Sequence, residues 1–178
     1  LGGANSQLGR ATCNVTPVYD GISYQCFEDG RIYLVGDKTV HVQGSLGRFY
    51  SSLGYHTSQL GYPNEAEQKA GNGSWYQDFD GGRIYSNWWY GQTRVQGSIG
   101  RFYASLGYQN SQLGYPTAGE VYTGSGWYQE FEGGRIYSVN GQAIRTQGSI
   151  GRYYASHGYH TSHLDHPIAG EVQTRSGR

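Results

Sequence analysis

Residues 126–138 read GWYQEFEGGRIYS and residues 74–86 read SWYQDFDGGRIYS, so nearly the same stretch occurs twice in the chain. In each copy large and polar residues alternate, a pair of glycines follows, and a short apolar run resumes. Such alternation is typical of a half-buried strand, and the glycine pair is typical of a tight turn. The stretch therefore predicts a β-hairpin that is repeated along the chain.

Other motifs recur with the same period. Gly-Arg-Ile-Tyr and Gln-Gly-Ser each occur three times, while Leu-Gly-Tyr-Pro begins at Leu60 and Leu113 and has worn copies from Leu8 and Leu164. A constant period of about 52 residues indicates a tandem repeat. We therefore predict a single repeat domain over 1–178, divided into units 1–52, 53–105 and 106–156 and a partial fourth unit, 157–178.

Each unit has the same expected order of elements, which is clearest in the second unit. A strand over 75–79 turns back at Arg83 and is followed by a short strand over 93–96. Apolar residues at helical spacing then follow Ser98, a good N-cap, and end at Gly107, a good helix stop. A helix of about two turns is unstable alone in water, so it must pack on its hairpin and its neighbours. The expected fold class is mostly β, an α+β tandem repeat.

The composition excludes several classes of protein. Aromatic residues make up 15% of the chain, with 18 tyrosines and 30 glycines, which is too aromatic for a disordered segment. The formal net charge is zero, so the chain lacks the positive charge typical of proteins that bind nucleic acid or anionic membranes. No apolar run approaches the roughly 20 residues of a membrane span, so we expect no membrane insertion.

The two cysteines, Cys13 and Cys26, flank a loop with Pro17 and Gly21. No further metal ligands lie close to them in the sequence, so we favour a disulfide over free thiols, and therefore an oxidising compartment. The chain starts at Leu1 and contains no methionine, which suits a processed product. We expect a secreted protein.

The repeated motifs resemble those of a known family. Leu-Gly-Tyr-Pro is followed by a glutamate seven residues after the leucine, then by F-x-G-G-R-I-Y, then by G-x-I-x-x-x-Y-x-x-x-G from Gly97 and Gly148. This combination resembles the LGFP repeat, over almost the whole chain. The resemblance implies an extracellular or cell-wall protein that anchors to wall polysaccharide, with repeats packed in a propeller-like or toroidal array. The first copy departs from the pattern at Ala11, Val15, Ser23 and Cys26, so we expect binding sites in copies two and three.

Sugar recognition requires flat apolar rings for the C–H face of the sugar and planar polar groups for its hydroxyls. One strand of copies two and three offers both kinds of group. The candidate ligand-binding residues are Trp75, Tyr76, Gln77, Asp78, Trp127, Tyr128, Gln129 and Glu130. About half of the residues on a strand must face a core, so we expect Trp or Tyr to point outward in each copy, not both.

A second aromatic cluster, Trp88-Trp89-Tyr90, has no counterpart in copy three, where Val139-Asn140 stand. Adjacent residues at a strand end point to opposite sides, so we expect one tryptophan in the core and the other as a binding platform.

Arginines recur in every copy, as a structural part of a repeat does. We expect these to pair with the recurring glutamates at unit junctions, with recognition of sugar hydroxyls as the alternative. The structural candidates are Arg31, Arg83, Arg135, Glu67, Glu120 and Glu171.

The last segment carries His157, His160, His163 and His166 at intervals of three. Imidazole is a common metal ligand, so a metal site is one interpretation. In register they replace ordinary residues of the previous copy, and the four cannot share one helical face. We therefore favour a drifted terminal copy and predict no metal or cofactor.

Paired carboxylates, Asp78/Asp80 and Glu130/Glu132, occur in the sequence, and a glycosidase requires two acids across a cleft. Each pair lies on one strand and is duplicated, which suits repeated weak sites better than one catalytic centre. We expect a non-catalytic, lectin-like module that binds polysaccharide or glycan and no nucleic acid, and homo-oligomer formation stays open. The alternative is a structural or protein-interaction protein, such as an inhibitor or coat component; a glycan-active hydrolase ranks below both.

Overall fold

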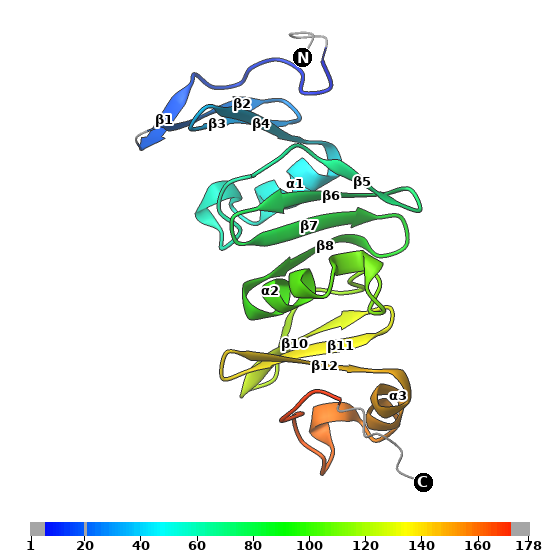
Figure 1. Ribbon diagram of the computed structural model, residues 1–178. Coiled ribbons are helices and arrows are strands. Elements are labelled where there is room, and N and C mark those ends of the chain that lie inside the picture. The colour runs from blue at the N-terminus through cyan, green and yellow to red at the C-terminus, as the bar shows by residue number, and fades with distance from the viewer. Residues whose placement is uncertain (1–5, 20, 172–178) are drawn as a thin grey trace. The chain divides into compact units, whose positions relative to one another are not determined.

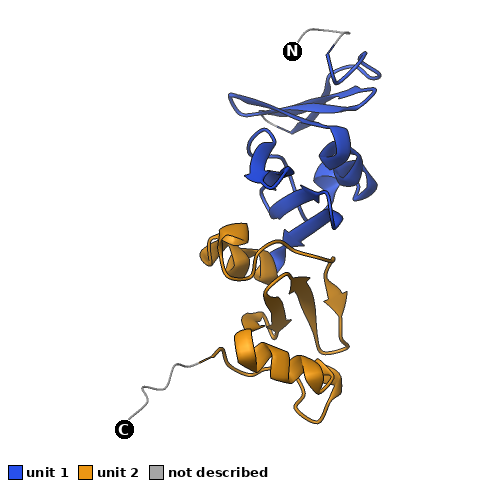
Figure 2. Ribbon diagram, turned by 90° about the vertical axis from the view of Figure 1, so that its right-hand side faces the viewer, with its two compact units in different colours: residues 1–97 blue, residues 98–178 orange. Residues whose placement is uncertain are grey.

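The computed structural model describes residues 6–19 and 21–171 (Figure 1). It contains three four-stranded antiparallel sheets, each followed by a nine-residue helix and a short 3-10 turn. The chain divides into two compact units, Leu1–Gly97 and Ser98–Arg178 (Figure 2). Within the described ranges, no helix is long and apolar enough to cross a membrane.

The first unit holds two of the sheets. Sheet A consists of β1 (Thr16–Tyr19), β2 (Ile22–Phe27), β3 (Gly30–Val35) and β4 (Lys38–Gln43). It is followed by α1 (Gly44–Ser52) and a 3-10 turn, Tyr55–Thr57. Sheet B consists of β5 (Gln68–Gly71), β6 (Ser74–Phe79), β7 (Gly82–Asn87) and β8 (Gly91–Gln96).

The second unit repeats this order once. After α2 (Gly97–Ser105), whose first residue closes the first unit, and a 3-10 turn, Tyr108–Asn110, comes sheet C. Its strands are β9 (Val121–Tyr122), β10 (Gly126–Phe131), β11 (Gly134–Val139) and β12 (Gln142–Gln147). The helix α3 (Gly148–Ser156) and the 3-10 turn Tyr159–Thr161 follow.

The predicted hairpins are present, in the register that the repeat requires. Trp75 lies opposite Ser86 in sheet B, and Trp127 lies opposite Ser138 in sheet C. Each sheet, however, has four strands where we predicted three. The sequence did not indicate β5 because Gln-Lys-Ala-Gly has no alternation of large apolar residues, and β9 contains only two residues.

The helices begin two residues earlier than predicted, and the serines are not N-caps. Gln43 precedes α1 and makes no side-chain capping bond. The Ser45 hydroxyl instead shares a hydrogen bond of 2.9 Å with the Ser86 hydroxyl of sheet B. In the second unit Ser98 pairs with Ser138 in the same way. These serines therefore connect α1 and α2 to the sheets that follow them.

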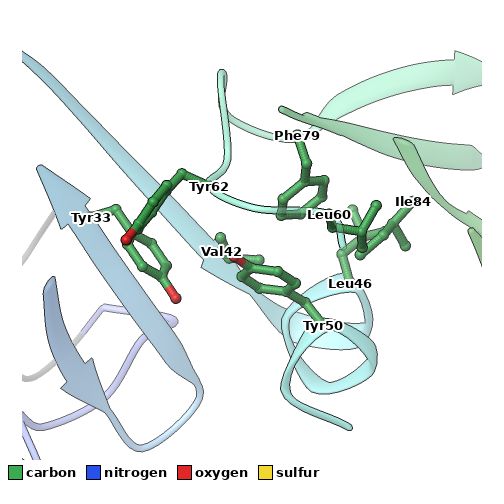
Figure 3. Packing of buried hydrophobic residues seen from close by; sticks show 8 residues of the cluster. All are labelled: Tyr33, Val42, Leu46, Tyr50, Leu60, Tyr62, Phe79 and Ile84. Atoms are coloured by element: carbon green, nitrogen blue, oxygen red, sulfur yellow. The ribbon is translucent and has the colours of Figure 1, made fainter. Parts of the chain in front are cut away.

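The core of the first unit is built around α1, which lies between sheet A and sheet B (Figure 3). Tyr50 of α1 is fully buried, and its ring centroid lies 4.5 Å from that of Phe79 in sheet B. Leu46, one turn earlier on the helix, is also buried in this cluster. The other cluster members come from β3, β4, β7 and the Leu-Gly-Tyr-Pro loop: Tyr33, Val42, Ile84, Leu60 and Tyr62.

The Leu-Gly-Tyr-Pro loop is a turn in which Leu60, Tyr62 and Pro63 are buried. Its backbone runs beside the end of β6, because the Asn64 N–H donates to the Asp78 carbonyl and the Gly81 N–H donates to the Leu60 carbonyl. From the helix side, the Tyr50 hydroxyl donates to the Gly61 carbonyl. The loop is therefore hydrogen-bonded to the sheet that follows it and is also held by the helix that precedes it.

The last repeat lacks a hairpin among the described residues, and its apolar face is open. Ile150 of α3, which corresponds to Leu46 of α1, is 59% exposed, whereas Leu46 is 1% exposed. Leu164, which corresponds to the buried Leu60, is exposed as well. In the described part of the chain no sheet closes on itself, and neither unit alone forms a propeller.

This difference in exposure predicts that two equivalent alanine substitutions lower the free energy of unfolding by different amounts. Leu46→Ala opens a cavity between α1 and sheet B and should lower the free energy of unfolding by about 2–5 kcal/mol. Ile150→Ala removes an exposed side chain and should change it by about 0.5 kcal/mol or less. Denaturant unfolding, with hydrogen exchange to localise the loss, measures both. Equal losses would show that the open face of α3 is covered in solution.

Candidate functional site

Trp75 and Trp127 occupy the same position in sheets B and C, and both indole rings reach the surface. Their exposed fractions are 37% and 46%. Each ring has a neighbour on the adjacent edge strand. The Lys69 ammonium lies 5.4 Å from the Trp75 ring centroid, and the Tyr122 ring lies 5.0 Å from that of Trp127. The sequence did not indicate Lys69 or Tyr122 as site residues because their strands were not predicted.

Tyr76 and Tyr128 face the other side of their sheets, as strand alternation requires. The Arg83 guanidinium lies 3.8 Å from the Tyr76 ring centroid, and Arg135 lies 4.3 Å from that of Tyr128. Both tyrosines are half-buried. The Trp-Tyr pairs therefore do not form continuous platforms, and only the tryptophans are presented at the surface on their own face.

Gln77 and Gln129 are buried, and their amides hold backbone in place. The Gln77 amide donates to the carbonyls of His41 and Glu65, at 2.9 and 2.8 Å. The Gln129 amide donates to the Ala118 carbonyl. Both side chains are covered by the fold and their amide N–H groups are already bonded to backbone carbonyls, so we leave both glutamines out of the site.

Asp78 and Glu130 are ion-paired with arginines of their own hairpins. Arg83 donates to both carboxylate oxygens of Asp78, at 2.6 and 2.8 Å, and Arg135 donates to Glu130. Burial by itself would lower the pKa of Arg83, but the hydrogen bonds and charge interactions with Asp78 and Tyr85 together outweigh that effect and hold the pKa above its usual value. Arg83 therefore stays charged within the fold.

These pairs correct the ion-pair partners that we expected. In the described residues Arg83 and Arg135 form their ion pairs with Asp78 and Glu130, rather than with the glutamates of the unit junctions. Glu67 instead accepts a long hydrogen bond from Gln43. The spacing alone did not indicate this, because a cross-strand pair depends on the register of the hairpin.

Repeat one lacks the carboxylate, since Cys26 stands at that position. Arg31 is stacked between aromatic rings instead, 4.5 Å from the Tyr24 centroid and 3.5 Å from that of Tyr55. Its buried Nε has no hydrogen-bond partner among the described residues. The first repeat therefore keeps the aromatic contacts of its arginine and loses the ion pair.

Trp88 and Trp89 are both exposed, so the expectation that one of them lies in the core was wrong. They lie beyond the last cross-strand pair of β7 and β8, Asn87 with Gly91. The Asn87 side-chain oxygen accepts the N–H groups of Trp89 and Tyr90, which closes this three-residue turn. Because Trp75 pairs with Ser86, next to Asn87, all three tryptophans of repeat two lie at the same end of sheet B.

The four histidines of the last segment fall into two pairs, His160 with His166 and His157 with His163. His160 and His166 have ring centroids 4.9 Å apart, and His157 stacks on Tyr153. In the described ranges no group of three or more His, Cys, Asp or Glu side chains is placed to hold a metal ion. His166 takes the position that Tyr62 has in the earlier repeat.

His160 belongs to an aromatic box with Tyr128 and Tyr137, and His56 occupies the same position beside Tyr24 and Tyr33. Burial lowers the pKa of both histidines, and the nearby arginines, Arg31 for His56 and Arg135 for His160, lower it further. For His160 the neighbouring His166 contributes in the same direction. The surroundings of His56 and His160 therefore favour the neutral form of the imidazole ring over the protonated form.

This geometry predicts a loss of stability on acidification. Because the folded-state pKa of each histidine lies below the usual value of about 6.5, the unfolded chain takes up protons first. Stability from the boxes is complete above that pH, falls as the pH drops below it, and levels off below the folded-state pKa.

The double variant His56→Gln, His160→Gln should flatten this slope in denaturant unfolding between pH 5 and 8, roughly the range in which histidine titrates. Glutamine is the natural residue at this position of repeat two, Gln109. A variant that keeps the wild-type slope would place the titrating groups elsewhere.

Comparison with known proteins agrees with this repeat structure. The model of the LGFP repeat family, described as "LGFP repeat", matches residues 60–111 and 113–162. No curated protein matches the chain. Both matched segments start at or next to a Leu-Gly-Tyr-Pro loop, where the backbone of that loop joins the following sheet. Together they cover more than half of the 178 residues. The chain therefore belongs to the LGFP repeat family.

Proposed function

We propose that this chain is a non-catalytic carbohydrate-binding module that binds cell-wall or extracellular polysaccharide. The observation that carries the proposal is the exposure of Trp75 and Trp127 at the same register position of two repeats. Exposed indole rings at repeated positions are typical of interaction sites, because burial is otherwise favourable for such large apolar groups. The flat indole face suits the C–H face of a sugar ring.

The two platforms differ in their surroundings. In repeat two, Lys69 lies beside Trp75, and Trp88 and Trp89 extend the exposed aromatic surface at the same end of the sheet. In repeat three, Tyr122 lies beside Trp127. Two weak sites on one chain gain affinity for a polymer through avidity, even when each site alone binds a short sugar weakly.

A structural or protein-interaction role is the second candidate. It is supported by the open apolar face of α3, where Ile150 and Leu164 are exposed. A toroidal or propeller-like closure of the repeats, which the family resemblance implied, would cover this face with another sheet. We keep that arrangement as part of the proposal.

We also propose that the chain acts outside the cell with Cys13 and Cys26 joined by a disulfide. The two thiols are free in this structure, but the residues are adjacent. The Cys26 N–H donates to the Cys13 sulfur at 2.9 Å, and the Thr12 N–H donates to the Cys26 carbonyl. The hydrogen bond with Cys26 lowers the pKa of Cys13, while burial raises that of Cys26, so Cys13 supplies the attacking thiolate in exchange with a disulfide oxidant.

Oxidation is tested by mass spectrometry of the protein after equilibration with oxidised glutathione. We expect the loss of two hydrogen atoms from the Cys13–Cys26 peptide pair, with two reduced glutathione molecules released. The bond should also raise the thermal stability, by closing a short loop worth about 3 kcal/mol. The Cys13→Ser variant is the control. Persistent mixed disulfides with glutathione, and no intramolecular bond, would contradict the proposal.

Binding is tested by tryptophan fluorescence during titration with soluble glycans and by sedimentation with insoluble wall polysaccharides. Trp127→Ala should weaken polymer binding by about tenfold or more, equivalent to ~1.4 kcal/mol, whereas Trp127→Phe, which keeps a flat ring, should retain most of it. The same pair at Trp75 tests repeat two.

Both alanine variants should unfold cooperatively, as the wild type does. If both fail to fold, the rings belong to the core. If the folded wild type binds no polymer of the panel, the protein-interaction role becomes the better proposal.

A further inference from the structure

The second unit contains a cavity of about 430 Å³ between sheet C and α3. This volume falls within the range of about 300–1,000 Å³ that is usual for small-molecule sites. The cavity lies near the turn between β10 and β11, whereas Trp127 lies near the opposite end of the same hairpin. The residues that line it include Glu130, Glu132, Gly133, Arg135, Thr146, Gln147 and Arg152.

Three lining side chains carry a buried polar atom that has no hydrogen-bond partner among the described residues. These atoms are the Nε of Arg135, the hydroxyl oxygen of Thr146 and the amide oxygen of Gln147. Thr146 is 6% exposed and Gln147 is 8% exposed. Buried polar atoms without a partner are rare in folded proteins. Three of them around one cavity indicate that a polar ligand completes their hydrogen bonding.

Thr146 is the most informative of the three. Thr146 lies opposite Arg135 on the neighbouring strand. In repeats one and two a valine stands at this position, Val42 opposite Arg31 and Val95 opposite Arg83. Threonine and valine have nearly the same shape, so packing does not account for the hydroxyl. A buried hydroxyl without a partner destabilises the fold. Its presence in repeat three therefore favours a role in binding.

The corresponding place in repeat one is different. Asp29 stands at the position of Gly133, and it forms an ion pair of 3.8 Å with Arg48, which stands at the position of Arg152. In repeat three the glycine leaves the guanidinium of Arg152 without this carboxylate, and the cavity lies between the two positions.

The charges around the cavity are balanced. Arg135 and Arg152 supply two positive charges, and Glu130 and Glu132 supply two negative charges. The unpartnered atoms include one donor, one acceptor and one hydroxyl that can do both. Such a set suits a neutral ligand with several hydroxyl groups better than an anion or a cation.

We propose that this cavity binds a single neutral sugar residue, as a second kind of subsite in the carbohydrate-binding module proposed above. The Nε–H of Arg135 donates to a sugar oxygen, and sugar hydroxyls donate to the Gln147 amide oxygen and to the Thr146 hydroxyl. The indole of Trp127 then contacts a different part of the polymer.

The test uses the full chain and the methyl glycosides of glucose, galactose, arabinose and N-acetylglucosamine, with glucuronate as the charged comparison. Two-dimensional amide NMR should show saturable shifts at Thr146, Gln147 and Gly151 with at least one neutral glycoside, and weaker or no shifts with glucuronate. If every glycoside leaves these signals unchanged, the proposal is overturned.

Matched variants make the test specific. Thr146→Val should weaken binding about tenfold, since it removes one hydrogen bond, and should leave the ligand-free protein as thermally stable as the wild type or more so. Thr146→Ser keeps a hydroxyl, so its Kd should lie within about threefold of the wild-type value. A threefold change in Kd corresponds to less than half of the binding free energy of a tenfold change. Wild-type binding by Thr146→Val would overturn the proposal, and so would a marked loss of stability in that variant, because the hydroxyl would then already be bonded within the fold.

The two proposals fail in different ways. If the Trp127 platform alone is real, polymer quenches tryptophan fluorescence and the glycosides leave the cavity signals unchanged. If the cavity alone is real, Trp127→Ala keeps the cavity shifts and polymer binding does not depend on the indole. Both readouts respond if both subsites exist.

Discussion

A short helix that must be covered on two sides is the constraint on which this structure depends. A helix of nine residues, such as α1, is not stable alone in water. Packing of Leu46 and Tyr50 between two sheets stabilises it. The hydroxyl of Tyr50 is buried with its ring and donates to the Gly61 carbonyl, so burial of the ring leaves no polar group unbonded. Tyr103 and Tyr154 make the same bond to the loops that follow α2 and α3. The helix, the loop that follows it and the next hairpin therefore stabilise one another and form one cooperative unit.

The arginine of each hairpin is the second fixed part of the repeat. It stacks on tyrosines in all three sheets and forms an ion pair in two of them. Because Asp78 and Glu130 serve this purpose, the polar groups expected beside the tryptophans are engaged in the fold. What remains at the surface is the aromatic ring itself, together with Lys69 or Tyr122 from the edge strand.

Variation between the repeats falls around these fixed parts. The position opposite the hairpin arginine on the preceding strand is Cys26, Asp78 or Glu130 in repeats one, two and three. The position opposite it on the following strand is Val42, Val95 or Thr146. The turn of repeat two is three residues long and carries two exposed tryptophans, whereas Asn140 and Gly141 form a two-residue turn in repeat three. Because the packing of helix, loop and hairpin stabilises the fold, the residues around it can differ between the repeats. Each repeat therefore has a different surface.

The sequence by itself determined the repeat, its hairpin, its helix and its family, because periodicity and glycine placement are local signals that need no tertiary context. It also indicated that either the tryptophan or the tyrosine of the hairpins in copies two and three would face outward, but it did not say which. It could not separate Trp75 from Gln77 in exposure, since alternation places both on one face of the strand, and Gln77 is buried where it bonds to the backbone of β4 at His41 and of the segment at Glu65. It did not assign Arg83 to Asp78, because that pair depends on strand register. The cavity beside Thr146 was likewise decided by tertiary structure: the strand, the turn and the helix that form its walls meet only when α3 packs on sheet C.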